Sequence, residues 1–284
     1  MNIVVTGGSG FLGRRIVTAL EGEHTVRVLT RQEPSPASVL AAADAVIHLA
    51  GEPVAQRWTE AARGRIRDSR VLGTRHLVAG LAAAPARPRV LVSASAIGIY
   101  GTRGDEPLTE SSRSGFGFLP EVCAAWEHEA AAAERWGARV VLLRTGIVLA
   151  PGGGALARML PAFRLGAGGR LGDGRQWMSW IHAADLVELV RFALTHPLRG
   201  ALNAVAPEPV TNREFTRLLA RALRRPAVLP VPAVALRLLF GEMSEVLLAS
   251  QRVLPRAAIE AGFRFAWPRL GPALANLFGR PMLD

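Results

Sequence analysis

The stretch Asn2-Ile-Val-Val-Thr-Gly-Gly-Ser-Gly-Phe-Leu-Gly13 joins a short apolar run to a set of spaced glycines. Residues 2–6 are rich in β-branched side chains, so we predict a buried strand that ends at the first glycine. From Phe11 to about Glu21 the apolar residues recur at helical spacing. A strand, a tight turn and a helix in this order form the beginning of a βαβ unit.

The glycines between this strand and this helix have the spacing G-x-x-G-x-x-G, at Gly7, Gly10 and Gly13. Glycine permits the tight turn, a close approach of backbone to a pyrophosphate and close packing of helix on sheet. The free N–H groups at the start of the helix attract an anion. The loop therefore predicts a dinucleotide site, whose further contacts come from its other residues, Ser9, Phe11 and Leu12.

The rest of the chain alternates between apolar strand-like runs and helical patterns, which predicts a parallel sheet covered on both faces. The expected fold class is α/β, a doubly wound Rossmann-like sheet. After Leu149 the sequence becomes rich in loops, and the part beyond Ala227 is mostly helical and interrupted by prolines. We predict a dinucleotide-binding domain over 1–150, with a return to the sheet near 178–206. A smaller, mostly helical substrate lobe then covers 151–177 and 207–284.

The segment from Arg31 to Asp44 is short for a chain of this type. A complete Rossmann half would hold both a helix and another strand there. The segment has room for one or two helical turns, so we expect the additional edge strand to be missing or vestigial.

The second strand, near 25–29, is followed by Thr30-Arg31, where NAD-binding proteins usually have an acidic residue. A guanidinium can hold a 2′-phosphate and stack on adenine. This favours NADP(H) over NAD(H), although Glu33 lies close by and an arginine here is also typical of a solvated loop.

Composition limits the classes of partner. The formal net charge is +11 and every basic residue is an arginine, but the arginines are scattered and do not alternate with aromatic residues. We therefore predict no nucleic-acid partner. No apolar run approaches the roughly 18 residues of a membrane span, and we predict no membrane partner. A single cysteine, Cys123, and the absence of a signal-like N-terminus suit the cytoplasm.

Several ordered blocks resemble the NAD(P)-dependent epimerase/dehydratase group of extended short-chain dehydrogenases/reductases. They are Thr6–Gly13, Asp44–Gly51, Ser93–Gly101, Arg144–Gly146 and Trp180–Asp185. Details such as Gly51-Glu-Pro53, Ser69-Arg70 and Cys123-Ala-Ala-Trp-Glu127 are similar to an atypical subfamily, sugar-nucleotide epimerase-like, of unassigned substrate and with a C-terminal extension. The resemblance implies an extended Rossmann fold and binding of NADPH. It also implies contacts to the cofactor from Thr30, Arg31, Leu49, Ala50, Gly51, Arg70 and Val148.

The usual catalytic pair of these reductases, a tyrosine with a lysine four residues later, is missing. The matching positions, counted from Glu127, hold Leu119 and Cys123. The remaining catalytic candidates are Ser95, where related enzymes keep a hydroxyl residue, and the only tyrosine, Tyr100. Arg175 and Gln176, in a glycine-rich loop, are candidate substrate contacts, and Asp185 is expected to cap a helix. No His/Cys cluster has the spacing of metal ligands.

Two functions fit these observations. The first is an NADP(H)-dependent oxidoreductase or epimerase-like enzyme that acts on a small carbonyl or hydroxyl substrate without the usual dyad. The second is a non-catalytic NADP(H)-binding protein that senses redox state or serves as a partner. The chain would be a monomer or a homodimer.

Overall fold

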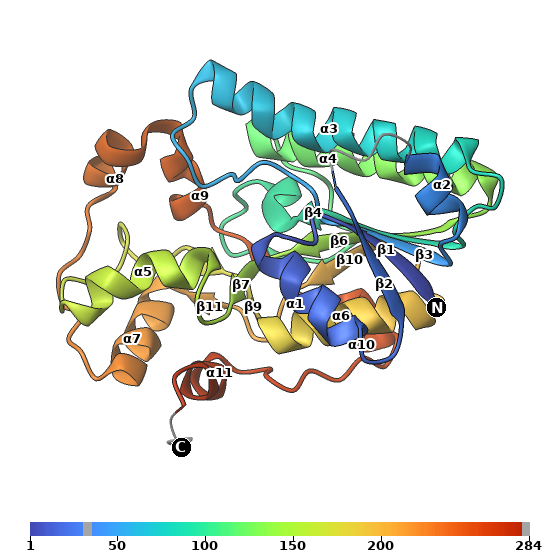
Figure 1. The fold of residues 1–284 in the computed structure, drawn as a ribbon. Coiled ribbons are helices and arrows are strands. Elements are labelled where there is room, and N and C mark those ends of the chain that lie inside the picture. Colours follow the sequence, from blue (N-terminus) through green and yellow to red (C-terminus); the bar gives the residue numbers. More distant parts are fainter. Residues whose placement is uncertain (31–35, 280–284) are drawn as a thin grey trace.

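A six-stranded parallel sheet forms the centre of the molecule (Figure 1). The computed structural model describes residues 1–30 and 36–279. The strand order is β10-β6-β4-β3-β1-β2, and each neighbouring pair is parallel. The strands are β1 Asn2–Thr6, β2 Thr25–Leu29, β3 Ala45–His48, β4 Val90–Ala96, β6 Arg139–Thr145 and β10 Gly200–Ala204. The predicted α/β fold is confirmed.

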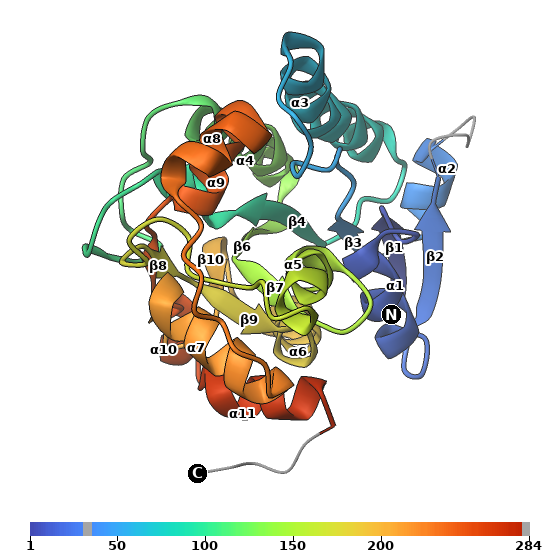
Figure 2. The same ribbon diagram turned by 90° about the vertical axis from the view of Figure 1, so that its left-hand side faces the viewer.

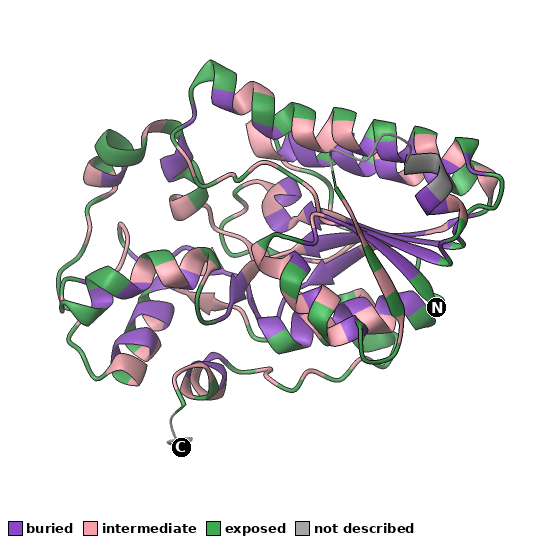
Figure 3. Ribbon diagram, in the orientation of Figure 1, coloured by how far each residue is buried: buried purple, intermediate pink, exposed green. Residues whose placement is uncertain are grey.

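Helices cover both faces of the sheet, and each face has its own apolar core. One core joins the sheet to α1 (Phe11–Leu20) and α6 (Ala183–Thr195). The other joins it to α2 (Pro36–Ala41), α3 (Glu60–Ala83) and α4 (Phe118–Ala131). Figure 3 shows the strands buried between these layers, while the outward sides of the helices are exposed. This double cover explains why the strands are nearly continuous apolar runs.

The sheet ends at β2 within the described residues. Among the described residues, β2 is followed by the short helix α2 and then by β3, and β1 lies between these two strands. The expected lack of an additional edge strand therefore holds for the described part of the chain.

The C-terminal part forms smaller elements beside the carboxyl ends of the strands (Figure 2). A separate core unites α5 (Gly154–Arg164), α7 (Asn212–Leu223) and α11 (Leu270–Leu277).

The remaining elements of the whole chain are short. The helices are α8 Ala233–Phe240, α9 Ser244–Leu248 and α10 Arg256–Glu260, with 3-10 turns η1 Ile97–Tyr100, η2 Ala132–Trp136 and η3 Gly241–Met243. The short strands are β5 Pro107–Leu108, β7 Ile147–Leu149, β8 Trp177–Met178, β9 Trp180–His182, β11 Val210–Thr211 and β12 Arg252–Val253.

Not all of this part packs on the lobe. Ala258 on α10 belongs to the core on the α1 side of the sheet, and Phe263 and Phe265 pack against the same core. The chain thus returns to the sheet after α9. The predicted assignment of all residues 207–284 to the substrate lobe does not include this contact.

Candidate functional site

Two glycines, Gly7 in the loop between β1 and α1 and Gly13 in the first turn of α1, lie too close to other backbone to carry a side chain. A Cβ on Gly7 would lie 2.8 Å from the backbone of Leu49 and Ala50, and Gly7 has a φ of +71°. A Cβ on Gly13 would lie 2.1 Å from the carbonyl oxygen of Gly7. Because side chains are excluded at both positions, the turn stays thin and the start of α1 stays accessible.

The start of α1 has the features of an anion site. Its N-cap is Gly10, and no side chain caps the helix. The first amide groups of a helix have no partner within it, and they carry the positive end of the helix dipole. Leu49 and Ala50 follow β3 at the same edge of the sheet, since Thr6 pairs with His48 in register. The cradle therefore lies at the switch point between β1 and β3, where doubly wound folds bind ligands.

The buried side chain of His48 links the end of β1 to α3, next to the glycine turn. Its Nδ1 lies 2.6 Å from Thr6 Oγ1, and its Nε2 lies 2.9 Å from Thr74 Oγ1 on α3. Burial lowers the pKa of His48 from 6.5 to about 4, so the ring is neutral near pH 7. The imidazole links β1, β3 and α3 directly beneath the glycine turn.

Arg70 on α3 lies beside Gly51 and Glu52, which follow β3. Its guanidinium donates to the carbonyl oxygens of Glu52 (2.9 Å) and Ile66 (3.1 Å), and its carbon lies 5.2 Å from the ring centre of Trp126. A Cβ on Gly51 would lie 3.3 Å from the same guanidinium. Burial lowers the pKa of Arg70, while Cys123 and Glu52 oppose that shift.

The end of β4 and the 3-10 turn after it contain small residues that are partly exposed. Ala94, Ala96 and Gly98 are partly exposed, whereas Ser95 is buried on the opposite face of the strand. Ser95 Oγ donates to Glu127 Oε1 at 2.6 Å. Its hydroxyl proton is thus used within the protein, and the catalytic role of Ser95 stays a prediction that this geometry does not favour.

The second catalytic candidate, Tyr100, is fully buried in the same network. Its hydroxyl donates to Asn203 Oδ1 at 2.7 Å and accepts from Arg144 Nη1 at 2.9 Å. Arg144 also makes a two-point ion pair with Glu127, with both distances 2.8 Å. Burial raises the pKa of Tyr100. The geometry favours a structural role for this tyrosine, and its catalytic role also stays a prediction.

The two positions where related enzymes carry the dyad hold apolar contacts. Leu119 and Cys123 both lie near Gly98, with Cβ-to-side-chain distances of 3.6 and 3.9 Å for a Cβ built there. Burial raises the pKa of Cys123 to about 12, with a further contribution from Glu127. The thiol therefore stays protonated and packs as a small apolar group.

The remaining predicted cofactor contacts lie around the cradle, with one exception. Thr30 is exposed directly after β2, and Val148 is buried in β7. Phe11 packs against Gly153 and Gly154 after β7. Ser9 is exposed in the turn, and Leu12 is half-buried in the first turn of α1. Arg31, on which the preference for NADP(H) rests, lies outside the described residues.

The predicted substrate residues differ in their surroundings. Arg175 is exposed, and its amide donates to Asp173 Oδ1. Gln176 is buried, and its side chain donates to the carbonyl oxygen of Leu171, which shapes the loop. Both roles stay predictions, and the buried amide favours loop support for Gln176.

The expectation for Asp185 is wrong. The N-cap of α6 is His182, whose Nδ1 accepts from the amide of Ala184. Asp185 instead accepts from the amides of Ala266 and Trp267, both at 2.9 Å. A carboxylate in a first turn looks the same in sequence whether it caps its own helix or holds a distant loop.

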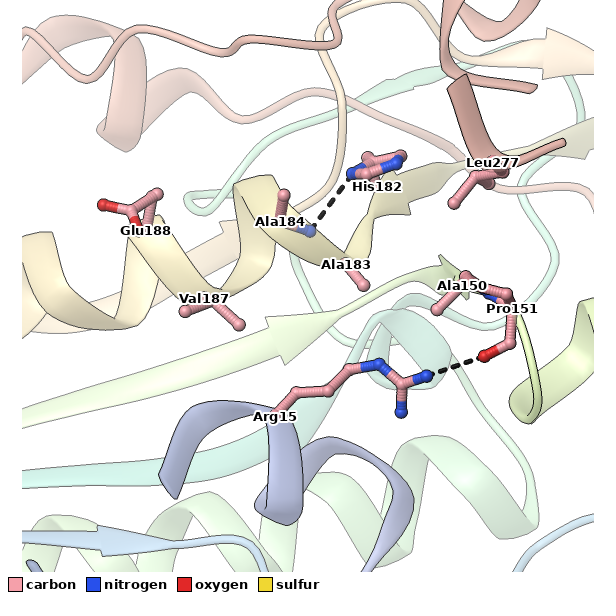
Figure 4. A pocket seen from close by; sticks show the side chains of 9 residues that line it. All are labelled: Arg15, Ala150, Pro151, His182, Ala183, Ala184, Val187, Glu188 and Leu277. Carbon is pink, nitrogen blue, oxygen red and sulfur yellow. Dashed lines mark hydrogen bonds between the residues drawn. The ribbon is translucent and has the colours of Figure 1, made fainter. Parts of the chain in front are cut away.

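Two cavities lie away from the glycine cradle. One of about 290 Å³ lies between α1 and α6, with Arg15 and His182 on its walls (Figure 4). Arg15 donates there to the carbonyl oxygen of Pro151. The other, of about 430 Å³, lies between the starts of α3 and α4, beside Trp58 and Phe118. No glycine of the loop lines either cavity, so the candidate site rests on the backbone cradle and on Arg70.

Neither a cluster that could hold a metal nor a membrane-crossing helix occurs in the described ranges 1–30 and 36–279. No three His, Cys, Asp or Glu residues there gather into a metal-binding group. No helix there combines the length and the apolar character that a span requires.

Comparison with known proteins agrees with this geometry. Residues 3–205 match the NAD dependent epimerase/dehydratase family, and residues 231–277 match a domain of unknown function, DUF1731. An epimerase family protein from Arabidopsis thaliana, SDR39U1 homolog, is 42% identical over 96% of this chain and 86% of its own. Its name places that relative in the chloroplast, so a cytoplasmic location for this chain stays a prediction.

Two solved structures are similar over the whole chain. Human SDR39U1, crystallised with NADPH, has a TM-score of 0.89 and 34% identity, covering 98% of this chain and 99% of its own. A nucleoside-diphosphate sugar epimerase from Corynebacterium glutamicum has a TM-score of 0.81 and 36% identity, covering 100% of this chain and 59% of its own. The chain belongs to the NAD-dependent epimerase/dehydratase family, as an SDR39U1-like member with a C-terminal DUF1731 domain.

Proposed function

We propose that the chain binds NADP(H) across the glycine cradle and transfers hydride to or from a small carbonyl or hydroxyl substrate. The observation that carries the proposal is the pair of backbone approaches at Gly7 and Gly13, beside a helix start that no side chain caps. Because no side chain fills the turn, the pyrophosphate of a dinucleotide can approach the backbone amides there. The NADPH in the human relative supports the choice of cofactor.

The residues present fit a dinucleotide on both sides of the switch point. The amides of α1 would hold the phosphates, Leu49 to Gly51 would lie along the cofactor, and Thr30 would face the adenosine end. The nicotinamide supplies the hydride when bound. At the end of β4 the partly exposed residues Ala94, Ala96 and Gly98 are small, so the flat nicotinamide ring could lie close to the backbone there.

Arg70 provides the positive charge that the dyad lysine provides in related enzymes. Cys123 occupies the lysine position and stays neutral, but the guanidinium of Arg70 on α3 lies 5.2 Å from the ring centre of Trp126, which is on the same helix α4 as Cys123. A guanidinium stays charged under all working conditions. It can bind a ribose hydroxyl or stabilise developing negative charge, but it cannot take a proton from the substrate.

The proton would therefore be exchanged with solvent, with the substrate or with a side chain outside the dyad positions. Near the dyad positions, Leu119 is apolar and Cys123 holds its proton. This is also the observation that favours the second function, a non-catalytic NADP(H)-binding protein. The two functions differ in one property, since only the enzyme oxidises NADPH in the presence of a carbonyl compound.

Arg70→Ala is expected to weaken NADPH binding about 10- to 100-fold, because a hydrogen bond from a charged donor contributes roughly 1.5–3 kcal/mol. The measurement is a titration that follows nicotinamide fluorescence. Arg75→Ala is the matched control, because Arg75 lies on the same helix but pairs with Glu129 at the surface. Equal affinity of Arg70→Ala and the unaltered protein would exclude this residue from the site.

Hydride transfer is tested by NADPH consumption with a panel of small aldehydes, ketones and keto sugars. Consumption that depends on the carbonyl compound, and that Arg70→Ala lowers, supports the enzyme. Tight NADPH binding with no consumption across the panel supports the non-catalytic function instead.

A further inference from the structure

The surface formed by α8 and the chain that leads to it exposes an unusual number of large apolar side chains. On α8, Val234, Leu238 and Leu239 are 64%, 80% and 69% exposed, and Leu236 is the buried residue that fixes the helix. Val228 and Leu229, just before α8, are 78% and 60% exposed. Such a concentration is rare on a surface that meets only water.

A sixth residue, Leu165, extends this surface. It is 84% exposed at the end of α5. The next residue, Gly166, faces Pro226, and Leu171 forms a β-bridge with Val231. In Figure 1 the end of α5, the connection from α7 and α8 lie along the left edge, and Figure 2 turns this side toward the viewer. We call Leu165, Val228, Leu229, Val234, Leu238 and Leu239 the apolar patch.

Within residues 215–241, which include five of the six residues of the apolar patch, the charged side chains are of one sign. The sequence from Phe215 to Gly241 contains five arginines and no acidic residue. Four of them, Arg221, Arg224, Arg225 and Arg237, are exposed. The fifth, Arg217, pairs with Glu214 on its own helix. The nearest acidic residues along the chain after α8 are Glu242, which pairs with Arg63, and exposed Glu245.

We propose that the apolar patch docks on an anionic lipid surface, with the leucines and valines entering the interface and the four exposed arginines binding lipid phosphates. Apolar side chains flanked by arginines are the combination that interfacial segments use. The long arginine stems can lie along the apolar surface while their guanidinium groups reach the headgroups. The expectation of no membrane partner rested on the missing spanning run, which does not bear on a helix that lies flat.

The same observations weigh against two other occupants. In a two-fold dimer each surface meets its own copy, so the arginines of one basic face would oppose those of the other. An acidic protein would match the charge, but strong protein contacts centre on side chains that fit packed pockets. Leu165, Val228 and Leu238 instead project with more than three quarters of their surface free, which suits a fluid surface.

The experiment is sedimentation of the full chain with phosphatidylcholine vesicles, prepared with or without phosphatidylglycerol. The unaltered protein is expected to sediment with the anionic vesicles only, and salt should release it, because the attraction is screened. The double variants Leu238→Ser/Leu239→Ser and Arg224→Gln/Arg225→Gln should each lower the bound fraction about tenfold or more.

The controls are Arg217→Gln, which removes a paired arginine from α7, and Ile259→Ser, which removes a half-exposed apolar residue from α10. Both should bind vesicles as the unaltered protein does. NADPH titration of every variant checks that the fold is intact. The proposal is wrong if anionic vesicles do not retain the protein, or if the patch variants and the controls bind alike. A patch-dependent dimer without vesicle binding would assign the patch to a second copy.

Discussion

Arg144→Ala is expected to destabilise the protein by about 3–5 kcal/mol, the cost of leaving one partner of a buried ion pair uncompensated. The side chains of Arg144 and Glu127 are 11% and 10% exposed. Without the guanidinium, the Glu127 carboxylate keeps only the hydrogen bond from Ser95, and the Tyr100 hydroxyl loses a donor. Urea unfolding followed by circular dichroism measures the change.

The matched control for this prediction is Arg75→Ala. Arg75 makes the same two-point contact with a carboxylate, that of Glu129, but Arg75 is largely exposed. Exposed pairs contribute little because water screens them. If both variants unfold at the same urea concentration, the buried ion pair of Arg144 and Glu127 does not stabilise the protein as predicted.

Acid is expected to cost the protein about 3 kcal/mol through His48 alone. Its pKa falls from 6.5 to about 4 on folding, because the ring is completely buried. Between these two values the unfolded chain binds a proton that the native protein does not, so stability falls as the pH falls from 6.5 to 4. Above pH 6.5 the ring is neutral in both states, and this contribution is constant.

The measurement is the free energy of unfolding at several pH values for the unaltered protein and two variants. His48→Asn removes the titrating ring and should flatten this part of the curve. His76→Asn removes an exposed histidine from the same α3 helix and should leave the curve unchanged. A His48→Asn curve as steep as that of the unaltered protein would show that other groups cause the acid sensitivity.

The fold was predictable from the sequence because its signals are local. The apolar strand, Gly7 to Gly13 and the helical spacing after Phe11 lie within one short segment, and the structure has β1 and α1 there. The end of β4 was harder to predict. In β4 the apolar run gives way to polar residues before the strand ends at Ala96, and the partner of buried Ser95 lies far away in the sequence.

The site was predictable only in part, for the same reason. The glycine spacing located the cradle, but the partners of Ser95 and Tyr100 lie 32 and 103 positions away. A hydroxyl group beside a cleft and a hydroxyl group in a buried network give the same pattern in one sequence. The approach of Arg70 to Cys123 also joins α3 to α4, and no spacing rule connects these two helices.

Titration with NADPH and NADH, for the unaltered protein and for Gly13→Ala, tests the central claim most directly. A Cβ at position 13 would lie 2.1 Å from the carbonyl oxygen of Gly7, so the turn must move. Gly22→Ala is the control, because a Cβ there meets nothing within 4 Å. We predict binding of NADPH in preference to NADH, lost in Gly13→Ala and kept in Gly22→Ala. Failure of the unaltered protein to bind either nucleotide, or equal binding by both variants, would contradict the account.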